Sequence, residues 1–188
     1  MKSKIIIIAL SVLLAISLCL NIIMIHRESR VHYHEEISIE PPLQPVDTAP
    51  DFSVQLLTGE TFTLSDHIGT VVVLDFWATW CGPCVQKMPA VQELSDQFEN
   101  DVIFVGMNVG EPVDRVQSFI TERGFTYPIG LDENGDIHRN LYPSPGIPYM
   151  VIINREGVIT ETILGGGASM RGTPMYDRIE NAILEALR

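Results

Sequence analysis

The chain has 188 residues, of which 46% are hydrophobic and 19% charged, and its formal net charge at pH 7 is −12. This length is enough for one domain with a sizeable core. Residues 1–46 carry four basic and four acidic side chains, so the negative charge belongs to residues 47–188. Such a surface repels phosphates, which argues against nucleic acid as a partner.

Residues 1–25 are predicted to form a membrane anchor. Residues 5–25 contain no charged side chain, and at about 1.5 Å per residue such a helix spans a hydrocarbon layer of roughly 30 Å. No small-residue cleavage pattern follows this segment, which disfavours a removed signal peptide. The short N-terminal tail favours a single-pass helix with the domain on the extracytoplasmic side. A cytoplasmic domain is the alternative, because the charges flanking the segment are nearly balanced.

Residues 26–46 are polar and then rich in proline, which predicts a stalk leading to a domain at residues 47–188. His32 and His34 lie close together in this stalk. Neither a cysteine nor a cluster of carboxylates completes a ligand set around them, so we predict no metal site.

The domain alternates predicted strands with predicted helices. Expected strands are 52–57 and 61–64, as a hairpin, followed by 71–77, 102–109, 127–131, 149–153 and 158–164; expected helices are 81–98, 112–123, 133–141 and a C-terminal helix containing Ile179 and Ile183. The continuous apolar runs at 71–77 and 102–109 are typical of strands covered on both sides. The predicted fold class is therefore α/β, with an N-terminal β-hairpin and a central mixed sheet flanked by helices on both faces.

The motif Cys81-Gly82-Pro83-Cys84 carries the clearest chemical signal. A structural zinc site needs four ligands, and the domain has only these two cysteines. A purely structural disulfide remains an alternative, although closing so short a loop adds little stability. A redox function explains more, because a cysteine at a strand-to-helix junction lies at the positive end of a helix dipole, which favours the thiolate. Cys81 then suits nucleophilic attack, and Cys84 suits the resolving step.

Two charged residues near this motif are candidates for tuning its chemistry. Asp75 lies within an apolar strand, where burial would raise its pKa and fit it to move a proton; the alternative is a side chain that reaches water. Lys87 is the only lysine beyond residue 4 and falls within the apolar stripe of the helix that begins near Cys81. In one interpretation its ammonium extends to water along the surface. In the other it stays near the dithiol or pairs with Asp75, and a cation there favours the thiolates.

The cysteine motif and several other segments of the domain resemble those of a known family. Residues 75–84 resemble the active-site segment of thioredoxin, Gly146-Ile147-Pro148 resembles its cis-proline loop, and Pro89 matches its helix-kinking proline. The anchor, the stalk and residues 108–111 and 148–154 narrow the resemblance to the membrane-tethered, thioredoxin-like proteins of the TlpA/ResA group. The resemblance covers residues 47–188. At the position of Lys87 this group often has a glutamate, so the chain departs from its relatives there.

The resemblance implies a thioredoxin fold with the dithiol at the tip of the first long helix. It implies a cis Pro148 beside the cysteines, with the Ile147 backbone able to pair with an extended substrate chain. Trp80, Gly82 and Pro83 would complete the substrate-binding surface.

The activity that the resemblance implies is reduction of disulfides outside the cytoplasm, often in apocytochrome c before haem attachment. Electrons would come from cytoplasmic thioredoxin through a membrane protein. The Cys81–Cys84 couple would be the only redox group, without a further cofactor.

Three competing functions use the same features. An oxidase or isomerase would donate the disulfide, but the Gly82-Pro83 dipeptide resembles the reducing members of the family. A thioredoxin-fold peroxidase typically carries a proline ahead of its reactive cysteine, and no proline lies between Gly69 and Gly82. A tethered, non-catalytic binding module would not need two intact cysteines.

Overall fold

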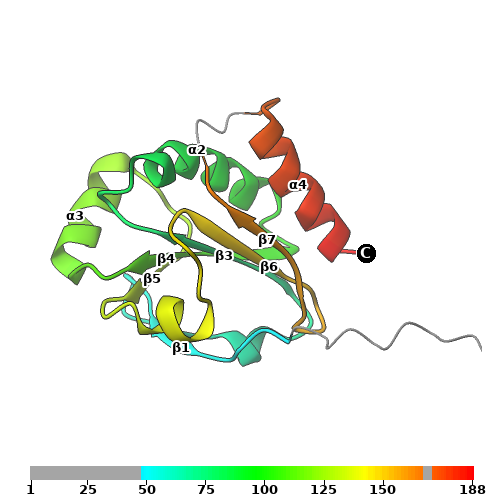
Figure 1. Cartoon of the computed structure of the whole chain (residues 1–188), viewed down its shortest axis with the longest axis horizontal. Helices are drawn as coiled ribbons and strands as arrows, with labels where there is room; N and C mark the ends of the chain where they lie inside the picture. The colour runs from blue at the N-terminus through cyan, green and yellow to red at the C-terminus, as the bar shows by residue number, and fades with distance from the viewer. Residues whose placement is uncertain (1–47, 167–170) are drawn as a thin grey trace, which may run out of the picture. The chain divides into compact units, whose positions relative to one another are not determined.

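The computed structural model describes residues 48–166 and 171–188 of the chain (Figure 1). The anchor and the stalk predicted at residues 1–46 lie outside these residues. Within the described part, no helix combines the length and the apolar character that crossing a bilayer requires. The described residues thus form the domain that was predicted to begin at residue 47.

A five-stranded mixed sheet forms the centre of the domain, in the order β5-β4-β3-β6-β7. The strands are β3 (Val71–Trp77), β4 (Val102–Val109), β5 (Ile129–Asp132), β6 (Tyr149–Ile153) and β7 (Ile159–Leu164). The first three are mutually parallel, whereas β6 runs antiparallel to β3 and β7 antiparallel to β6. Every residue of β3 is buried, so the apolar run at 71–77 correctly predicted the central strand, and its carboxyl end leads directly to Cys81.

Three long helices cover one face of this sheet: α2 (Gly82–Gln97), α3 (Val113–Arg123) and α4 (Pro174–Ala186). Buried residues of these helices join alternate residues of β3 in one hydrophobic cluster that includes Val73, Leu94, Val116 and Ile179. Figure 1 shows α2 and α4 lying over the sheet. The crossovers β3-α2-β4 and β4-α3-β5 step in the same direction along the sheet, and right-handed crossovers of that kind place both helices on the same face.

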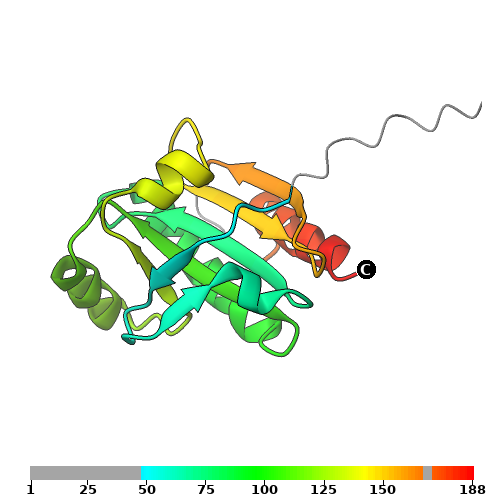
Figure 2. The same ribbon diagram turned by 90° about the horizontal axis from the view of Figure 1, so that it is seen from below.

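The opposite face is covered by the hairpin of β1 (Ser53–Gln55) and β2 (Thr61–Thr63) and by two short helices, η1 (Leu64–His67) and the π-helix η2 (Ile137–Leu141) (Figure 2). A second hydrophobic cluster joins Phe52, Phe62 and Leu64 to this face. The thioredoxin fold is as predicted, but among residues 48–166 and 171–188 the helices on this second face are limited to η1 and η2. The hydrophobic pattern of the sequence could not predict this difference, because it indicates that a strand is covered on both sides but not which elements cover it.

Candidate active site

Cys81 and Cys84 form a disulfide at the start of α2. Cys81 is the N-cap residue of this helix, and its sulfur accepts the N–H of Cys84 at 3.3 Å. Pro83 lies in the first turn, where a missing N–H leaves no helical bond unmade. The N–H groups and the dipole at this helix end both favour a thiolate at Cys81. Cys81 is 5% exposed and Cys84 is fully buried, so an incoming substrate reaches Cys81 first.

The Gly146-Ile147-Pro148 loop lies against the disulfide. The peptide bond between Ile147 and Pro148 is cis, and the Cys81 sulfur lies 3.7 Å from the carbonyl oxygen of Ile147. Next to Cys81 in the sequence, Trp80 is 69% exposed. The structure thus gathers the predicted binding residues around the reactive sulfur, with a large aromatic surface available to a partner.

Gly166 is a site residue that the sequence analysis did not identify. The N–H of Gly165 donates to the carbonyl oxygen of Pro148 at 2.8 Å, which holds this segment over the cis-proline loop. A Cβ at Gly166 would lie only 2.9 Å from Cγ of Pro148. Glycine is therefore required here for close approach.

Asp75 and Lys87 form a buried ion pair beneath the dithiol helix. The Lys87 Nζ lies 2.6 Å from Oδ1 of Asp75, and the two side chains are 0% and 1% exposed respectively. Burial raises the pKa of Asp75, and the ammonium of Lys87 offsets this only in part. The expectation of a buried Asp75 with a raised pKa is confirmed, and so is its pairing with Lys87. The alternatives, an aspartate reaching water and a lysine extending to the surface, are wrong.

The reason for this pairing is the packing of α2 on β3. Lys87 lies on the side of the helix that faces the sheet, where its neighbours Met88 and Val91 are also buried. Asp75 is on the strand beneath, and the second oxygen of its carboxylate, Oδ2, has no hydrogen-bond partner. The pair therefore leaves one carboxylate oxygen available to take a proton. An effect of Lys87 on the pKa values of the cysteines stays a prediction.

Glu111 fixes the loop that precedes Cys81. Its carboxylate is 2% exposed and accepts hydrogen bonds from the backbone N–H of Thr79 at 2.7 Å, from the hydroxyl of Thr79 and from the side-chain amide of Asn108 at 2.8 Å. The sequence analysis used residues 108–111 only to support the resemblance and gave Glu111 no role. Its contact with Thr79 depends on the parallel pairing of Trp77 with Asn108, which the sequence pattern does not specify.

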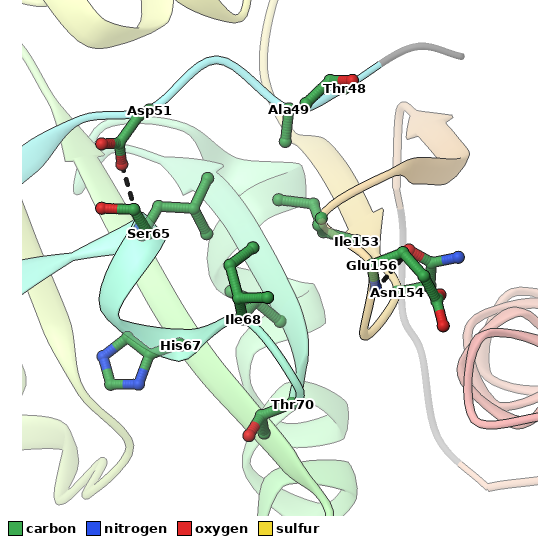
Figure 3. A pocket seen from close by; sticks show the side chains of 13 residues that line it. Thr48, Ala49, Asp51, Ser65, His67, Ile68, Thr70, Ile153, Asn154 and Glu156 are labelled. Atoms are coloured by element: carbon green, nitrogen blue, oxygen red, sulfur yellow. Dashed lines mark hydrogen bonds between the residues drawn. The ribbon is translucent and has the colours of Figure 1, made fainter.

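A hollow of about 170 Å³ lies at the opposite end of β3, near Thr70 and Val72. Figure 3 shows Asp51 turned toward Ser65 at its edge, where the carboxylate accepts the N–H of Ser65 at 2.9 Å. Hydrogen bonds from Ser65 lower the pKa of Asp51. No cysteine lines this hollow, so the thiol chemistry is confined to the other end of the strand.

Comparisons with known proteins agree with this geometry. The Redoxin family profile matches residues 44–175. Thiol-disulfide oxidoreductase ResA of Geobacillus kaustophilus is 37% identical over 119 residues, which cover 63% of this chain and 68% of that protein. Thioredoxin-like protein YneN of Bacillus subtilis is 35% identical over 129 residues, covering 67% and 75% of the two chains.

Comparison with solved structures indicates the same group of thiol–disulfide exchange proteins. A Chlorobium tepidum protein assigned as thiol:disulfide interchange protein DsbE matches with a TM-score of 0.68 and 31% identity, over 78% of this chain and 99% of that one. A Bacteroides thetaiotaomicron protein assigned as a protein disulfide isomerase matches with a TM-score of 0.65 and 32% identity, over 77% and 90%. The chain therefore belongs to the Redoxin family, and it is a thioredoxin-like thiol–disulfide oxidoreductase of the TlpA/ResA type, a protein disulfide reductase.

Proposed function

We propose that this oxidoreductase reduces disulfides of exported proteins on the extracytoplasmic side of the membrane, to which residues 1–25 anchor it through the stalk at 26–46. The observation that carries the proposal is the Cys81–Cys84 disulfide at the start of α2, beside the cis-proline loop. The uncharged segment at residues 5–25 supports the anchor. Apocytochrome c before haem attachment is the candidate substrate, on the resemblance to the TlpA/ResA group.

In the first chemical step, the thiolate of reduced Cys81 attacks one sulfur of the substrate disulfide. A mixed disulfide forms between Cys81 and the substrate, and the other substrate sulfur leaves as a thiolate that takes a proton. The exposed Trp80 and the backbone of Ile147 hold the substrate chain over Cys81 during this step. The N–H of Cys84 stabilises the sulfur of Cys81 as an anion.

In the second step, Cys84 loses its proton and attacks the sulfur of Cys81, which releases the substrate as a dithiol. Cys84 is fully buried, so a nearby buried group is better placed than bulk water to take this proton. Asp75 is the candidate, because it is paired under α2 with Lys87, three residues after Cys84, and has a raised pKa and an unpartnered Oδ2. Lys87 stabilises the carboxylate when it is ionised. The reaction leaves the Cys81–Cys84 disulfide.

Two electrons must then return to the cysteines before the next turnover. We propose that a membrane protein relays them from the cytoplasm, as in the TlpA/ResA group. The cysteine pair itself carries the two electrons, so the cycle as written uses no separate cofactor.

The test is mixed-disulfide trapping in cells that express the full chain. Cys84→Ser should accumulate exported proteins covalently bound through Cys81, and their identification by mass spectrometry would name the substrate. Cys81→Ser should trap none, because the attacking sulfur is gone. Equal trapping by both variants would contradict the assignment of Cys81, and capture of cytoplasmic proteins alone would contradict the proposed location.

A further inference from the structure

The loop at residues 143–147, which leads to Pro148, has little backbone support of its own. None of its residues makes a backbone–backbone hydrogen bond to another described residue. Pro143 and Pro145 have no N–H to donate. The position of this loop must therefore depend on side-chain contacts, and these begin on the face of the sheet opposite the dithiol helix.

The supporting contacts run from His138 through Ser144 to the loop backbone. The hydroxyl of Ser144 donates to the carbonyl oxygen of Gly146 at 2.7 Å, and Nε2 of His138 lies 2.9 Å from the same hydroxyl oxygen. Since the single hydroxyl hydrogen is used for Gly146, Nε2 of His138 must carry a hydrogen and donate it to Ser144. One side chain outside the loop is thus linked to the carbonyl just before Ile147.

His138 is itself held firmly. It lies in the π-helix η2, and its backbone N–H donates to Oδ2 of Asp132 at 2.9 Å. Its ring lies 5.2 Å from the ring of Phe76 and 6.5 Å from that of Tyr149, between centroids. Burial lowers the pKa of His138, which favours a neutral ring, and the contact with Ser144 places the ring hydrogen on Nε2. The imidazole is therefore a fixed donor mounted on the sheet.

We propose that His138 is a positioning residue for substrate: through Ser144 it fixes the Gly146 carbonyl and so the Ile147 backbone on which a substrate strand pairs. The inference rests on the proposed function, because Ile147 matters only when an extended peptide binds over Cys81. The Ile147 carbonyl lies 3.7 Å from the Cys81 sulfur, so a displaced loop would also misalign the substrate disulfide with the nucleophile. His138 does not touch the reacting atoms.

The test compares His138→Phe, which keeps a flat ring against Phe76 but removes the donor, with His138→Gln, whose amide N–H can replace Nε2–H. Reduction of a disulfide-bonded peptide should show a KM about fivefold higher in His138→Phe, as expected for one lost neutral hydrogen bond. His138→Gln should recover most of this loss. Ser144→Ala should match His138→Phe, and the double variant should be no worse than either single one.

Bis(2-hydroxyethyl) disulfide provides the control substrate, because it has no peptide backbone to pair with Ile147. Its reduction should change less than about twofold in His138→Phe, because this substrate does not use the Ile147 backbone that the lost hydrogen bond positions. An equal slowing with both substrates, or an unchanged KM for the peptide, would overturn the inference. Circular dichroism and the thermal midpoint would identify a variant that fails to fold, in which case Ser144→Ala alone decides.

A backbone measurement separates failure of this inference from failure of the proposed function. The NMR order parameters of Gly146 and Ile147 should fall in His138→Phe and stay near the wild-type values in His138→Gln. If the wild type itself does not reduce peptide disulfides, the proposed function fails, and the order parameters still decide whether His138 fixes the loop. Unchanged order parameters in His138→Phe would overturn the inference.

Discussion

Asp75 and Glu111 are both carboxylates at most 2% exposed. Asp75 contacts Lys87, three residues after Cys84, and Glu111 contacts Thr79, two residues before Cys81. Glu111 accepts three hydrogen bonds, from Thr79 and Asn108, that involve both of its oxygens. Asp75 pairs with Lys87 through one oxygen, and the other has no partner. A carboxylate with both oxygens engaged serves as an anchor, whereas one with a free oxygen and a raised pKa can exchange a proton. From this difference we propose that Glu111 maintains the geometry of the site and that Asp75 takes part in its chemistry.

The largest expected effect comes from removing the ammonium that balances Asp75. Lys87→Met keeps a long unbranched side chain but leaves the carboxylate buried without a counter-charge. Losing one member of a buried ion pair costs about 3–5 kcal/mol while the other member stays charged. Urea unfolding of the oxidised variant should show a loss of about 3 kcal/mol at about pH 8 and roughly half of that at about pH 5.

The sign of this pH dependence follows from the direction of the pKa shift. Folding raises the pKa of Asp75, so the folded state binds this proton more tightly than the unfolded chain does. The stability that Asp75 contributes is complete below the pKa of an unfolded carboxyl and is lost as the pH rises through the folded pKa. Without Lys87 the folded pKa rises further. Asp75→Asn/Lys87→Met should recover most of the loss, and an equal loss at both pH values would refute this account.

Glu111 should behave differently when its acceptors are removed. Glu111→Leu leaves the N–H of Thr79 and the amide of Asn108 buried without a partner, which should cost about 2 kcal/mol in the free energy of unfolding. Glu111→Gln is the matched control: it keeps an oxygen acceptor and should lose much less. An equal loss in Glu111→Leu and Glu111→Gln would show that the acceptor oxygens of Glu111 do not hold the Thr79 loop.

The sequence predicted Asp75 and not the role of Glu111 for a physical reason. A charge inside a continuous apolar strand is visible in the strand itself, because burial of all neighbouring residues leaves it no route to water. Glu111 follows β4 in a turn, where a carboxylate is ordinary. Its function arises only when parallel pairing of β3 with β4 brings residue 108 beside residue 77, and register is a tertiary property.

The same limit applies to the rest of the fold and site. Residues 71–77, 102–109 and 149–153 were predicted as strands with their observed bounds, because apolar runs and turns are local signals. The cover on the second sheet face and the close packing of Gly166 on Pro148 join residues distant in sequence. The His138–Ser144 link spans six residues but depends on the course of an irregular loop. Such contacts leave no periodic signal, so the structure was needed to find them.

The rate of the resolving step in Asp75→Asn tests whether Asp75 takes the proton of Cys84. The resolving step, measured as release of peptide from a mixed disulfide on Cys81, should slow about tenfold near neutral pH, a modest effect for loss of a general base. The gap should narrow as the pH approaches the range in which Cys84 ionises without help. Asp75→Asn also leaves Lys87 without its partner, so the double variant Asp75→Asn/Lys87→Met decides the cause. If it is as slow as the single variant, the missing base limits the rate; if it regains the wild-type rate, the stranded ammonium was responsible and Asp75 has a structural role only.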